Sequence, residues 1–367
     1  MTEPKEHPFI NVDEIPCQEI SDPAVLSKTP LVSVKMITYN HEPYITQAIE
    51  GVLQQETNFP FDLVIGEDCS TDGTREIVFD YQKKYPDIIR VITSDKNVGA
   101  NKNSKRVIKA CRGKYIASCE GDDYWHHPQK LQKQVDYLEA HPECGLVHSD
   151  VVWHNVETGK TIPRHYKKRK LYHDHENVLR SIIEFKYHVM TCSAVVRKDL
   201  LDEIRETCRF EFSEKFLMGD IQTWIEIAYR SKVKYIDEPL ATYNALPESA
   251  CRTKDVEKII RFSRSGRAIG LHYADKYGSK DSMELKKCIL ERFNKTLIRA
   301  ACRARKPELA REILKDSRKY DVPLGPVGSL CFFGAQKNVV CFLIRMLLLL
   351  ALRCRRLLSR IKWLDYG

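Results

Sequence analysis

The sequence predicts an α/β protein with a mixed, mostly parallel sheet that is flanked by helices and followed by a C-terminal helical extension. Three observations support this fold class. Apolar, β-branched runs alternate with segments of helical spacing between residues 31 and 119, short polar loops join them, and residues 255–320 are charged and helical in character. Strand–helix–strand alternation with short loops produces right-handed βαβ units and therefore parallel strands.

The elements follow in order along the chain, each assigned from its apolar period and from the turn residues that close it. Strands are predicted at residues 31–39, 61–67, 88–93, 114–119, 145–153, 189–197 and 233–236. Helices are predicted at residues 45–53, 74–85, 101–111, 131–140, 219–230, 255–270, 283–305 and 308–318.

The chain divides into four parts on this interpretation. These are an extended N-terminal arm at 1–30, an α/β domain at 31–250, a helical extension at 251–322, and a linker with a basic amphipathic tail at 323–367. The arm lacks the apolar core of a secretory signal, which predicts a cytoplasmic protein. None of the 13 cysteines pair at C-x-x-C spacing, so reduced, buried thiols are expected rather than a zinc ribbon or a redox motif.

The basic character is interpreted as mostly a property of the tail, because residues 337–367 carry seven basic side chains and one acidic one and so account for +6 of the net charge of +9. The apolar run at 339–352 is shorter than the roughly 20 residues that a spanning helix needs. An interfacial helix with basic flanks is the preferred interpretation, and it predicts peripheral contact with the inner face of the cell membrane. A core helix packed on the α/β domain is the alternative. Nucleic acid is disfavoured as the partner of this tail, because no aromatic residues are interleaved with its positive charge.

Polar clusters stand at the ends of four predicted strands. They occupy residues 38–42, 68–74, 94–101 and 120–123. The carboxyl ends of parallel strands meet at one edge of a sheet, where ligands bind in open α/β sheets. The four clusters therefore predict a single binding site.

The cluster at the fourth strand end holds three carboxylates, those of Glu120, Asp122 and Asp123. Carboxylates this close repel one another unless a cation neutralises them. Oxygen ligands suit Mg²⁺ or Mn²⁺, which would also bridge a diphosphate and stabilise its charge as it leaves. The alternative is a solvated acidic turn in which Asp123 caps a helix. Tyr39 offers a ring for stacking, and Asp68 could accept a hydrogen bond from a base, although both are also ordinary turn or core residues.

Together these segments resemble the inverting family 2 glycosyltransferases of the bacterial polysaccharide type, which have the GT-A (Rossmann-like) fold. The resemblance covers about residues 31–245. It rests on the order of these motifs: Thr38-Tyr39-Asn40, Asp68-x-Ser70-Thr71-Asp72-Gly73-Thr74, Asn97-x-Gly99, Gly113-Lys114-Tyr115-Ile116 and Glu120-Gly121-Asp122-Asp123-Tyr124-Trp125.

The resemblance implies a nucleotide-sugar site, with UDP as the expected nucleotide. Tyr39 and Asp68 would contact the base, and Glu120 stands where the family has the first Asp of its DxD motif. The implied nucleotide-sugar residues are Thr38, Tyr39, Asn40, Glu42, Asp68, Asn97, Glu120 and Asp122. The implied ligands of Mn²⁺ or Mg²⁺ are Asp122 and Asp123.

An inverting transfer needs a base that deprotonates the acceptor hydroxyl. The family places an acid at the start of a late helix, and Met218-Gly219-Asp220-x-x-x-Trp224 matches that position. Asp220 is therefore the predicted catalytic base, with an N-cap as the alternative. The Q-x-x-R-W motif of processive synthases is absent, which favours single transfers. The segment from Tyr243 is similar to the Tyr-Arg-x-His-x-x-Ser stretch of relatives but lacks its Arg and His.

The expected function is metal-dependent, inverting hexosyl transfer from a nucleotide sugar to a saccharide or a lipid-linked saccharide, in surface-polysaccharide synthesis. A non-catalytic nucleotide-sugar-binding protein is the alternative. A sugar-nucleotide pyrophosphorylase is disfavoured, because residues 31–42 contain no glycine. The basic loop at 164–170 could face an anionic acceptor or form an ordinary charged hairpin.

Overall fold

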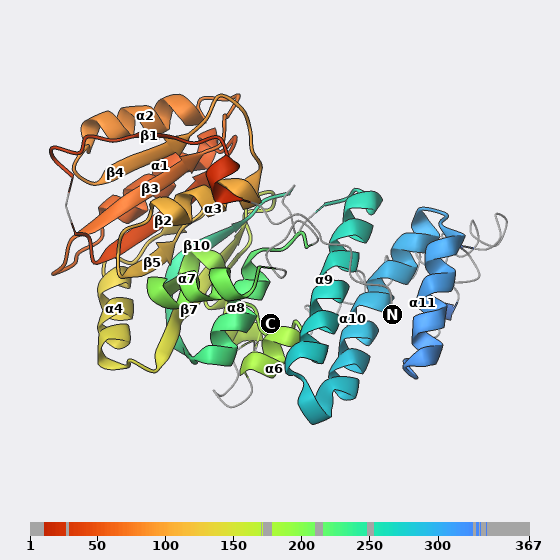
Figure 1. Ribbon diagram of the computed structural model, residues 1–367. Helices are drawn as coiled ribbons and strands as arrows, with labels where there is room; N and C mark the ends of the chain where they lie inside the picture. Colours follow the sequence, from red (N-terminus) through yellow and green to blue (C-terminus); the bar gives the residue numbers. More distant parts are fainter. Residues whose placement is uncertain are drawn as a thin grey trace, which may run out of the picture. The chain divides into compact units, whose positions relative to one another are not determined.

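The computed structural model describes residues 11–26, 29–169, 171, 178–209, 216–247, 253–325, 328, 329, 331 and 335. The chain forms two compact units, Met1–Pro247 and Glu248–Gly367. The first holds the sheet with its helices, and the second holds helices (Figure 1).

The first unit is built on one mixed sheet with the strand order β1-β4-β3-β2-β5-β9-β7-β10-β6, to which β8 is added beside β7. The strands are β1 (Gln18–Ile20), β2 (Val32–Thr38), β3 (Phe61–Glu67), β4 (Ile89–Thr93), β5 (Tyr115–Ser118), β6 (Tyr124–Trp125), β7 (Cys144–Asn155), β8 (Thr161–Ile162), β9 (Ala194–Arg197) and β10 (Lys232–Ala245). Strands β2, β3, β4 and β5 pair in parallel, as do β7 and β10, whereas β1, β6, β8 and β9 pair antiparallel.

Helices connect the strands and cover the sheet. They are α1 (Glu42–Leu53), α2 (Thr74–Lys84), α3 (Ala100–Ala110), α4 (Lys130–Ala140), α5 (His165–Arg169), α6 (Val178–Ile183), α7 (Lys198–Thr207) and α8 (Asp220–Arg230). Short 3-10 turns lie at Val12–Glu14, Thr191–Ser193 and Ser279–Asp281. The predicted α/β class with a mixed sheet, flanking helices and C-terminal helices is confirmed.

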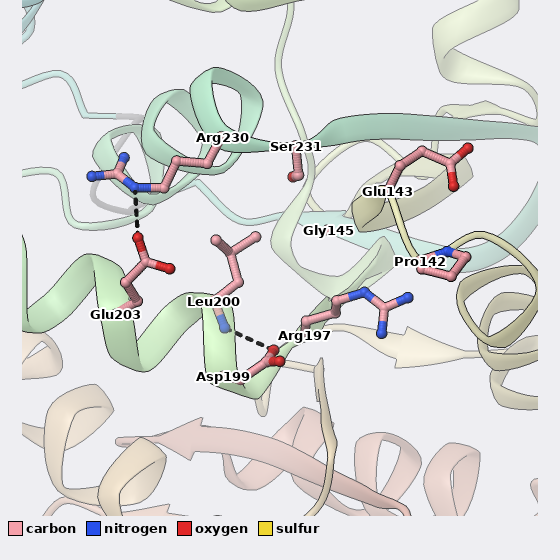
Figure 2. Close-up of a pocket in the computed structure, with 9 residues that line it drawn as sticks. All are labelled: Pro142, Glu143, Gly145, Arg197, Asp199, Leu200, Glu203, Arg230 and Ser231. Carbon is pink, nitrogen blue, oxygen red and sulfur yellow. Dashed lines mark hydrogen bonds and ion pairs between the residues drawn. The ribbon is translucent and has the colours of Figure 1, made fainter.

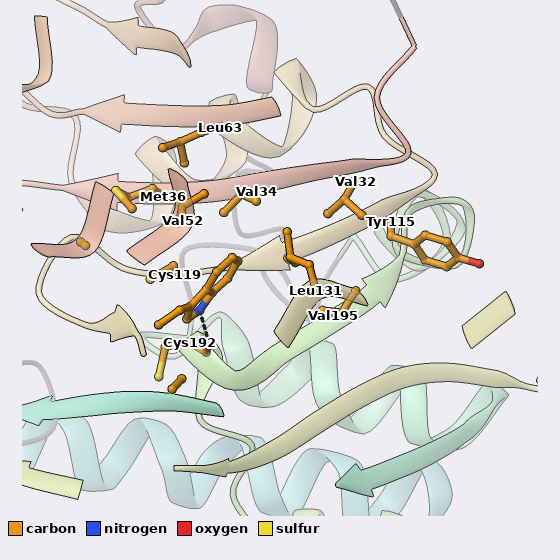
Figure 3. Packing of buried hydrophobic residues seen from close by; sticks show 14 of the residues in the cluster. Val32, Val34, Met36, Val52, Leu63, Tyr115, Cys119, Leu131, Cys192 and Val195 are labelled. Atoms are coloured by element: carbon orange, nitrogen blue, oxygen red, sulfur yellow. Dashed lines mark hydrogen bonds between the residues drawn. The ribbon is translucent and has the colours of Figure 1, made fainter. Parts of the chain in front are cut away.

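The core lies between the sheet and the helices α1 and α4. Strand β2 is buried along almost its whole length, as expected for a strand that helices cover on both faces. Figure 3 shows Val34 and Met36 of β2 close to Leu63 of β3. Trp125 is fully buried in this cluster, and its indole Nε1 donates to the carbonyl of Cys192 at 2.7 Å. This bond holds the short strand β6 inside the fold.

Part of the segment expected as an extended arm belongs to the sheet, because β1 pairs antiparallel with β4. The buried guanidinium of Arg90 holds this edge. Its Nε donates to Glu19 at 2.8 Å, and its Nη1 donates to Asp62 at 3.1 Å.

The second unit contains α9 (Val256–Tyr277), α10 (Ser282–Arg303) and α11 (Pro307–Lys319). These helices enclose a separate apolar cluster around Leu297, Ile298 and Ile313. No helix in the described parts of the chain is both long enough and apolar enough to cross a membrane. The predicted interfacial helix at 339–352 lies outside the described residues.

Candidate active site

The candidate site lies at the carboxyl edge of the sheet, where the loops after β2, β3, β4 and β5 meet. The loops after β2 and β3 are joined by side chains from both. Asn40, in the left-handed backbone region with φ of 54°, accepts from the N–H of Thr71 at 2.8 Å through its Oδ1. The Glu42 carboxylate accepts from the N–H of Gly73 at 2.9 Å. The predicted nucleotide-sugar residues Asn40 and Glu42 thus bind the neighbouring loop.

Tyr39 follows a buried strand but is itself exposed at this edge, with 42% of its surface accessible to solvent. The phenol ring is therefore available for stacking against a planar ligand. Thr38 is buried beside it, and its Oγ1 lies 3.2 Å from Nδ1 of His41.

Asp68 is buried at the end of β3 and fixes the loop that follows β4. Its two carboxylate oxygens accept from the N–H groups of Val98 at 2.8 Å and Gly99 at 2.9 Å. Burial raises the pKa of Asp68 above its usual value, and these two hydrogen bonds oppose that change. Asn97 completes the turn by accepting from the N–H of Gly99 at 3.0 Å.

Arg106 is a buried member of this region that the sequence analysis missed. Its guanidinium donates to the carbonyls of Pro16 and Glu67, each at 2.9 Å, and lies 3.5 Å from Asp68. It thereby links the N-terminal segment to the loops after β3 and β4. A single arginine within a helical run carries no sequence signal that separates it from the solvated basic residues around it.

The acid loop, residues Glu120–Asp123, turns tightly against β2. The N–H of Gly121 donates to the carbonyl of Ile37 at 3.0 Å, and the N–H of Asp123 donates to the carbonyl of Glu120 at 3.1 Å. A Cβ at Gly121 would lie 2.6 Å from Oγ1 of Thr38. Only glycine fits this close approach, which brings the acid loop against the loop after β2.

The carboxylates of the acid loop lie in surroundings that disfavour their charge. Burial raises the pKa of Glu120 to about 7, with the charge of Asp122 adding to the effect and that of Lys35 opposing it. Burial, together with the charges of Asp122 and Glu120, raises the pKa of Asp123 well above its usual value. A bound cation would favour the ionised forms of these groups.

The acid loop fits a divalent cation that takes only part of its ligands from the protein. No cluster of three or more His, Cys, Asp and Glu side chains able to hold a metal occurs within the described ranges. Mg²⁺ and similar ions are commonly bound through one or two carboxylates, with phosphate oxygens and water as the other ligands. Asp122 and Asp123 are the pair that could serve in this way.

Asp220 is the first residue of α8 and is exposed. Gly219 occupies the N-cap position, so the interpretation of Asp220 as an N-cap is wrong. The Asp220 carboxylate accepts a hydrogen bond from the N–H of Ile221 at 2.8 Å. The charge of Asp220 acts on Glu120 and on Lys35. Asp220 therefore lies within electrostatic range of the acid loop.

Lys35 is a second residue that the sequence analysis missed. It lies on β2, is 7% exposed, and its Nζ donates to Oγ of Ser104 at 3.3 Å. Burial lowers the pKa of Lys35, while the charges of Glu120 and Asp220 oppose that change. It supplies a buried positive charge close to two predicted site acids.

The basic loop at 164–170 pairs with an acid of its own unit. Arg164 forms an ion pair with Asp237, and Lys167 contacts the same carboxylate at 3.0 Å. The two cations share one carboxylate and are compensated only in part, and His165–Arg169 form the helix α5 in place of the loop or hairpin expected there.

A pocket of about 290 Å³ lies away from the candidate site, at the opposite edge of the sheet. Figure 2 shows it at the starts of β7 and β10 and at the first turn of α7. Its lining residues are Pro142, Glu143, Gly145, Arg197, Asp199, Leu200, Glu203, Arg230 and Ser231. Arg230 and Glu203 form an ion pair at 3.5 Å, so the charges in the pocket are partly compensated.

Comparisons with known proteins bear on this site. The family model described as Glycosyl transferase family 2 matches residues 33–205. An uncharacterized glycosyltransferase of Methanocaldococcus jannaschii is 30% identical over 218 residues, which cover 58% of this chain and 70% of the relative. The chain belongs to glycosyltransferase family 2.

Other relatives of this family 2 chain match over a shorter length. An uncharacterized protein of Mycobacterium tuberculosis is 47% identical over 112 residues, 30% of this chain and 32% of the relative. A protein of Bacillus subtilis named as the teichuronic acid biosynthesis glycosyltransferase TuaG is 36% identical over 109 residues, 30% of this chain and 42% of the relative. The chain thus spans about a third of the length of the mycobacterial relative and under half that of TuaG.

Two solved structures share the fold. TarS 1-349 of S. aureus matches with a TM-score of 0.52 and 17% identity over 83% of this chain and 87% of that one. The mannosyltransferase PcManGT of Pyrobaculum calidifontis, in complex with GDP-Man and Mn²⁺, matches with a TM-score of 0.51 and 17% identity over 90% of each chain. At these identities the similarity concerns the fold alone.

Proposed function

We propose that this family 2 protein is a metal-dependent inverting glycosyltransferase that moves a hexosyl group from a nucleotide sugar, with UDP as the nucleotide, to a saccharide or lipid-linked saccharide hydroxyl. The observation that carries the proposal is the meeting of three features at one sheet edge. These are the exposed ring of Tyr39, the loop fixed by Asp68, and the acid loop with its buried Asp123.

The residues take the following roles in this proposal. Tyr39 and Asp68 contact the base, while Asp122 and Asp123 hold Mn²⁺ or Mg²⁺. The metal supplies positive charge that neutralises the diphosphate. Thr38 packs against the acid loop, and Asn40, Glu42 and Asn97 shape the nucleotide pocket through the loops that they fix. Asp68 already accepts two main-chain hydrogen bonds and one from Arg106, so a base N–H would be its fourth donor.

The transfer proceeds in one displacement. The acceptor oxygen bonds to the anomeric carbon on the face opposite the diphosphate, and its proton passes to the carboxylate of Asp220. The bond from the anomeric carbon to the diphosphate oxygen breaks, and the nucleoside diphosphate leaves with the bonding electron pair. The buried ammonium of Lys35, close to Glu120 and Asp220, helps the site to hold its negative charge.

Surface-polysaccharide synthesis is the proposed setting, supported by the name of the relative TuaG. In this proposal residues 31–250 form the catalytic domain, residues 251–322 form a helical extension, and the basic tail at 323–367 contacts the inner face of the membrane. The helices of the second unit support such a contact. Residues 253–325 carry 19 basic side chains against 10 acidic ones, so the tail is not the main source of positive charge, contrary to the sequence-based expectation.

The solvent-exposed face of α10 concentrates this charge. Its exposed basic side chains, spaced three, four and four residues apart, are Arg292, Lys295, Arg299 and Arg303. Within the described part of the chain, only Lys295 of this set has an ion-pair partner, Glu291 at 2.6 Å. Each basic residue near an anionic bilayer contributes about 1 kcal/mol to binding. This basic face, Arg292–Arg303, is therefore suited to an anionic lipid surface.

A thermal-shift experiment tests the proposal. The wild-type chain and Asp123→Ala are each heated with UDP-sugars or GDP-sugars, with and without Mn²⁺. The expected result is stabilisation of the wild type by a sugar nucleotide, in a manner that requires both Mn²⁺ and Asp123. Stabilisation without turnover of any sugar would favour a non-catalytic binding protein, and no shift with any sugar nucleotide would refute the proposal.

A further inference from the structure

Asn244, near the end of β10, bonds to both aspartates of the acid loop. Its main-chain N–H donates to Oδ1 of Asp123 at 2.8 Å, and its side-chain Nδ2 donates to the carbonyl oxygen of Asp122 at 2.8 Å. Asn244 is 6% exposed, so these bonds form away from bulk water. Asn244, more than 100 positions further along the chain, thus forms hydrogen bonds to both Asp122 and Asp123.

The amide of Asn244 is itself held by a third residue. Nδ1 of His154 lies 2.9 Å from Oδ1 of Asn244. The two residues are direct partners in the parallel pairing of β7 and β10. The contact with His154 occupies the amide oxygen and so directs the amide nitrogen toward Asp122.

The same strand carries the segment that follows the acid loop. Tyr124 pairs with Thr242, and Trp125 pairs with Ala241, in the antiparallel β6–β10 ladder. Strand β10 therefore contacts this region at two points. Asn244 bonds to the acid loop, and Thr242 pairs with Tyr124, the residue that follows the loop. The ladder alone would hold Tyr124 and Trp125, while the orientation of the Asp122–Asp123 peptide depends on the Asn244 side chain.

We propose that Asn244 is a positioning residue that orients the two aspartates for a divalent cation and a diphosphate, and that His154 fixes the Asn244 amide for this task. The main-chain bond fixes the Asp123 carboxylate through its Oδ1. The side-chain bond sets the direction in which Asp122 leaves the loop. This inference rests on the proposed metal-dependent function.

The test uses the full chain and Asn244→Ala, which removes the side-chain bond and keeps the main-chain N–H. Mn²⁺ affinity is measured by electron paramagnetic resonance with and without UDP, and KM for Mn²⁺ is measured separately from kcat. Residues that orient metal ligands typically change metal affinity by 10–100-fold. We expect at least a tenfold loss of Mn²⁺ affinity in the presence of UDP, with a raised KM for the metal.

Two further variants separate positioning from a general loss of structure. Asn244→Asp keeps the shape but removes the donor to Asp122, so it should lose as much Mn²⁺ affinity as Asn244→Ala. His154→Ala leaves Asn244 in place and should lose less Mn²⁺ affinity than Asn244→Ala, because the amide is then held from one side only. Asn155→Ala is the matched control, because among the described residues its side chain bonds only to Thr158 of the adjacent turn, and it should bind Mn²⁺ like the wild type.

The outcomes distinguish this inference from the proposed function. If the wild type binds no Mn²⁺ with UDP, the metal-dependent function fails and the inference falls with it. If the wild type binds and Asn244→Asp or Asn244→Ala binds equally well, the inference alone is overturned. Loss of affinity in folded Asn244 variants with an unchanged Asn155→Ala supports it.

Discussion

Replacing Gly121 with alanine tests whether the close contact between the acid loop and β2 sets the geometry of the site. The added Cβ would lie 2.6 Å from Oγ1 and 2.8 Å from Cβ of Thr38, whereas ordinary contacts begin at 3.4 Å. The loop must therefore move by about 0.8 Å. Thr38 cannot yield easily, because it is β-branched, buried and bonded to His41.

A displacement of this size has a calculable effect on activity and stability. Misplacing reacting groups by about 1 Å can lower the rate about 100-fold, and overpacking a buried site costs about 1–3 kcal/mol of unfolding free energy. We therefore expect Gly121→Ala to remain folded but to lose about 100-fold in kcat/KM. Sugar transfer is measured by release of the nucleoside diphosphate, and stability by urea unfolding.

Gly159→Ala is the matched control for this experiment. Gly159 has a φ of 67° and nothing within 4 Å of an added Cβ. The left-handed backbone there costs an L-residue about 1–2 kcal/mol, so stability should fall by a similar amount while activity is kept. A Gly121→Ala enzyme with kcat/KM within threefold of the wild type would refute the reasoning, whatever its stability.

Three other variants probe separate features. Asp220→Asn should lower kcat by about 10²–10⁴-fold while UDP binding measured by calorimetry is kept; a kcat close to that of the wild type would exclude Asp220 as the base. Burial lowers the pKa of Lys130 to about 7 from 10.5, so the unfolded chain binds more protons between these values, and stability should rise by about 2 kcal/mol from pH 7 to pH 9. Urea unfolding of Lys130→Met should lack this rise, and an equal rise in both proteins would contradict the assignment. Charge reversal by Arg292→Glu and Arg299→Glu in the full chain should lower co-sedimentation with anionic vesicles more than tenfold, with neutral vesicles as the control, and unchanged co-sedimentation would exclude the basic face of α10 as a membrane contact.

The sequence predicts the first half of the catalytic unit well because its signals are local. Each strand from residue 31 to residue 119 is a compact apolar run, and the first three are each followed by a helix of clear period. The positions of the strand ends then follow from the parallel βαβ rule, and they bring the acid loop and the loops after β2, β3 and β4 to one edge. Helix α1 begins three residues earlier than expected, at Glu42, because Pro43 is well tolerated in a first helical turn.

The second half depends on pairings that local patterns do not encode. The strand expected at 233–236 extends as β10 to Ala245, although Asp237, Glu238 and Pro239 read as the end of a strand. Irregularities in register on both sides of Pro239 let the strand continue beside β7. The strand predicted from the sequence ends at Ile236, so it does not reach Asn244 and does not bring Asn244 to the acid loop.

The candidate site residues also divide into those that the sequence predicts and those that only the structure shows. Asp122, Asp123 and Asp220 are readable from the sequence because charged side chains at the ends of strands and helices form motifs. Asn244 and Arg106 act through hydrogen bonds to the main chain of distant residues, and such bonds depend on the tertiary fold. A polar side chain of this kind resembles any other turn or helix residue in the sequence.

The acid loop combines Asp122 and Asp123, which the sequence predicts as candidate site residues, with a contact to Asn244 that only the structure shows. Asp123 is buried, and the charges of Asp122 and Glu120 further disfavour its ionised form, yet the loop cannot open to solvent without losing the Gly121 contact with β2 and the Asn244 bonds to β10. Strained or costly arrangements of this kind persist where the surrounding structure fixes them from several sides. Under the proposed function, a bound cation would offset this cost, because it would favour the ionised form of Asp123. In that proposal, the contacts with β2 and β10 would hold the acid loop in place for the cation before the donor binds.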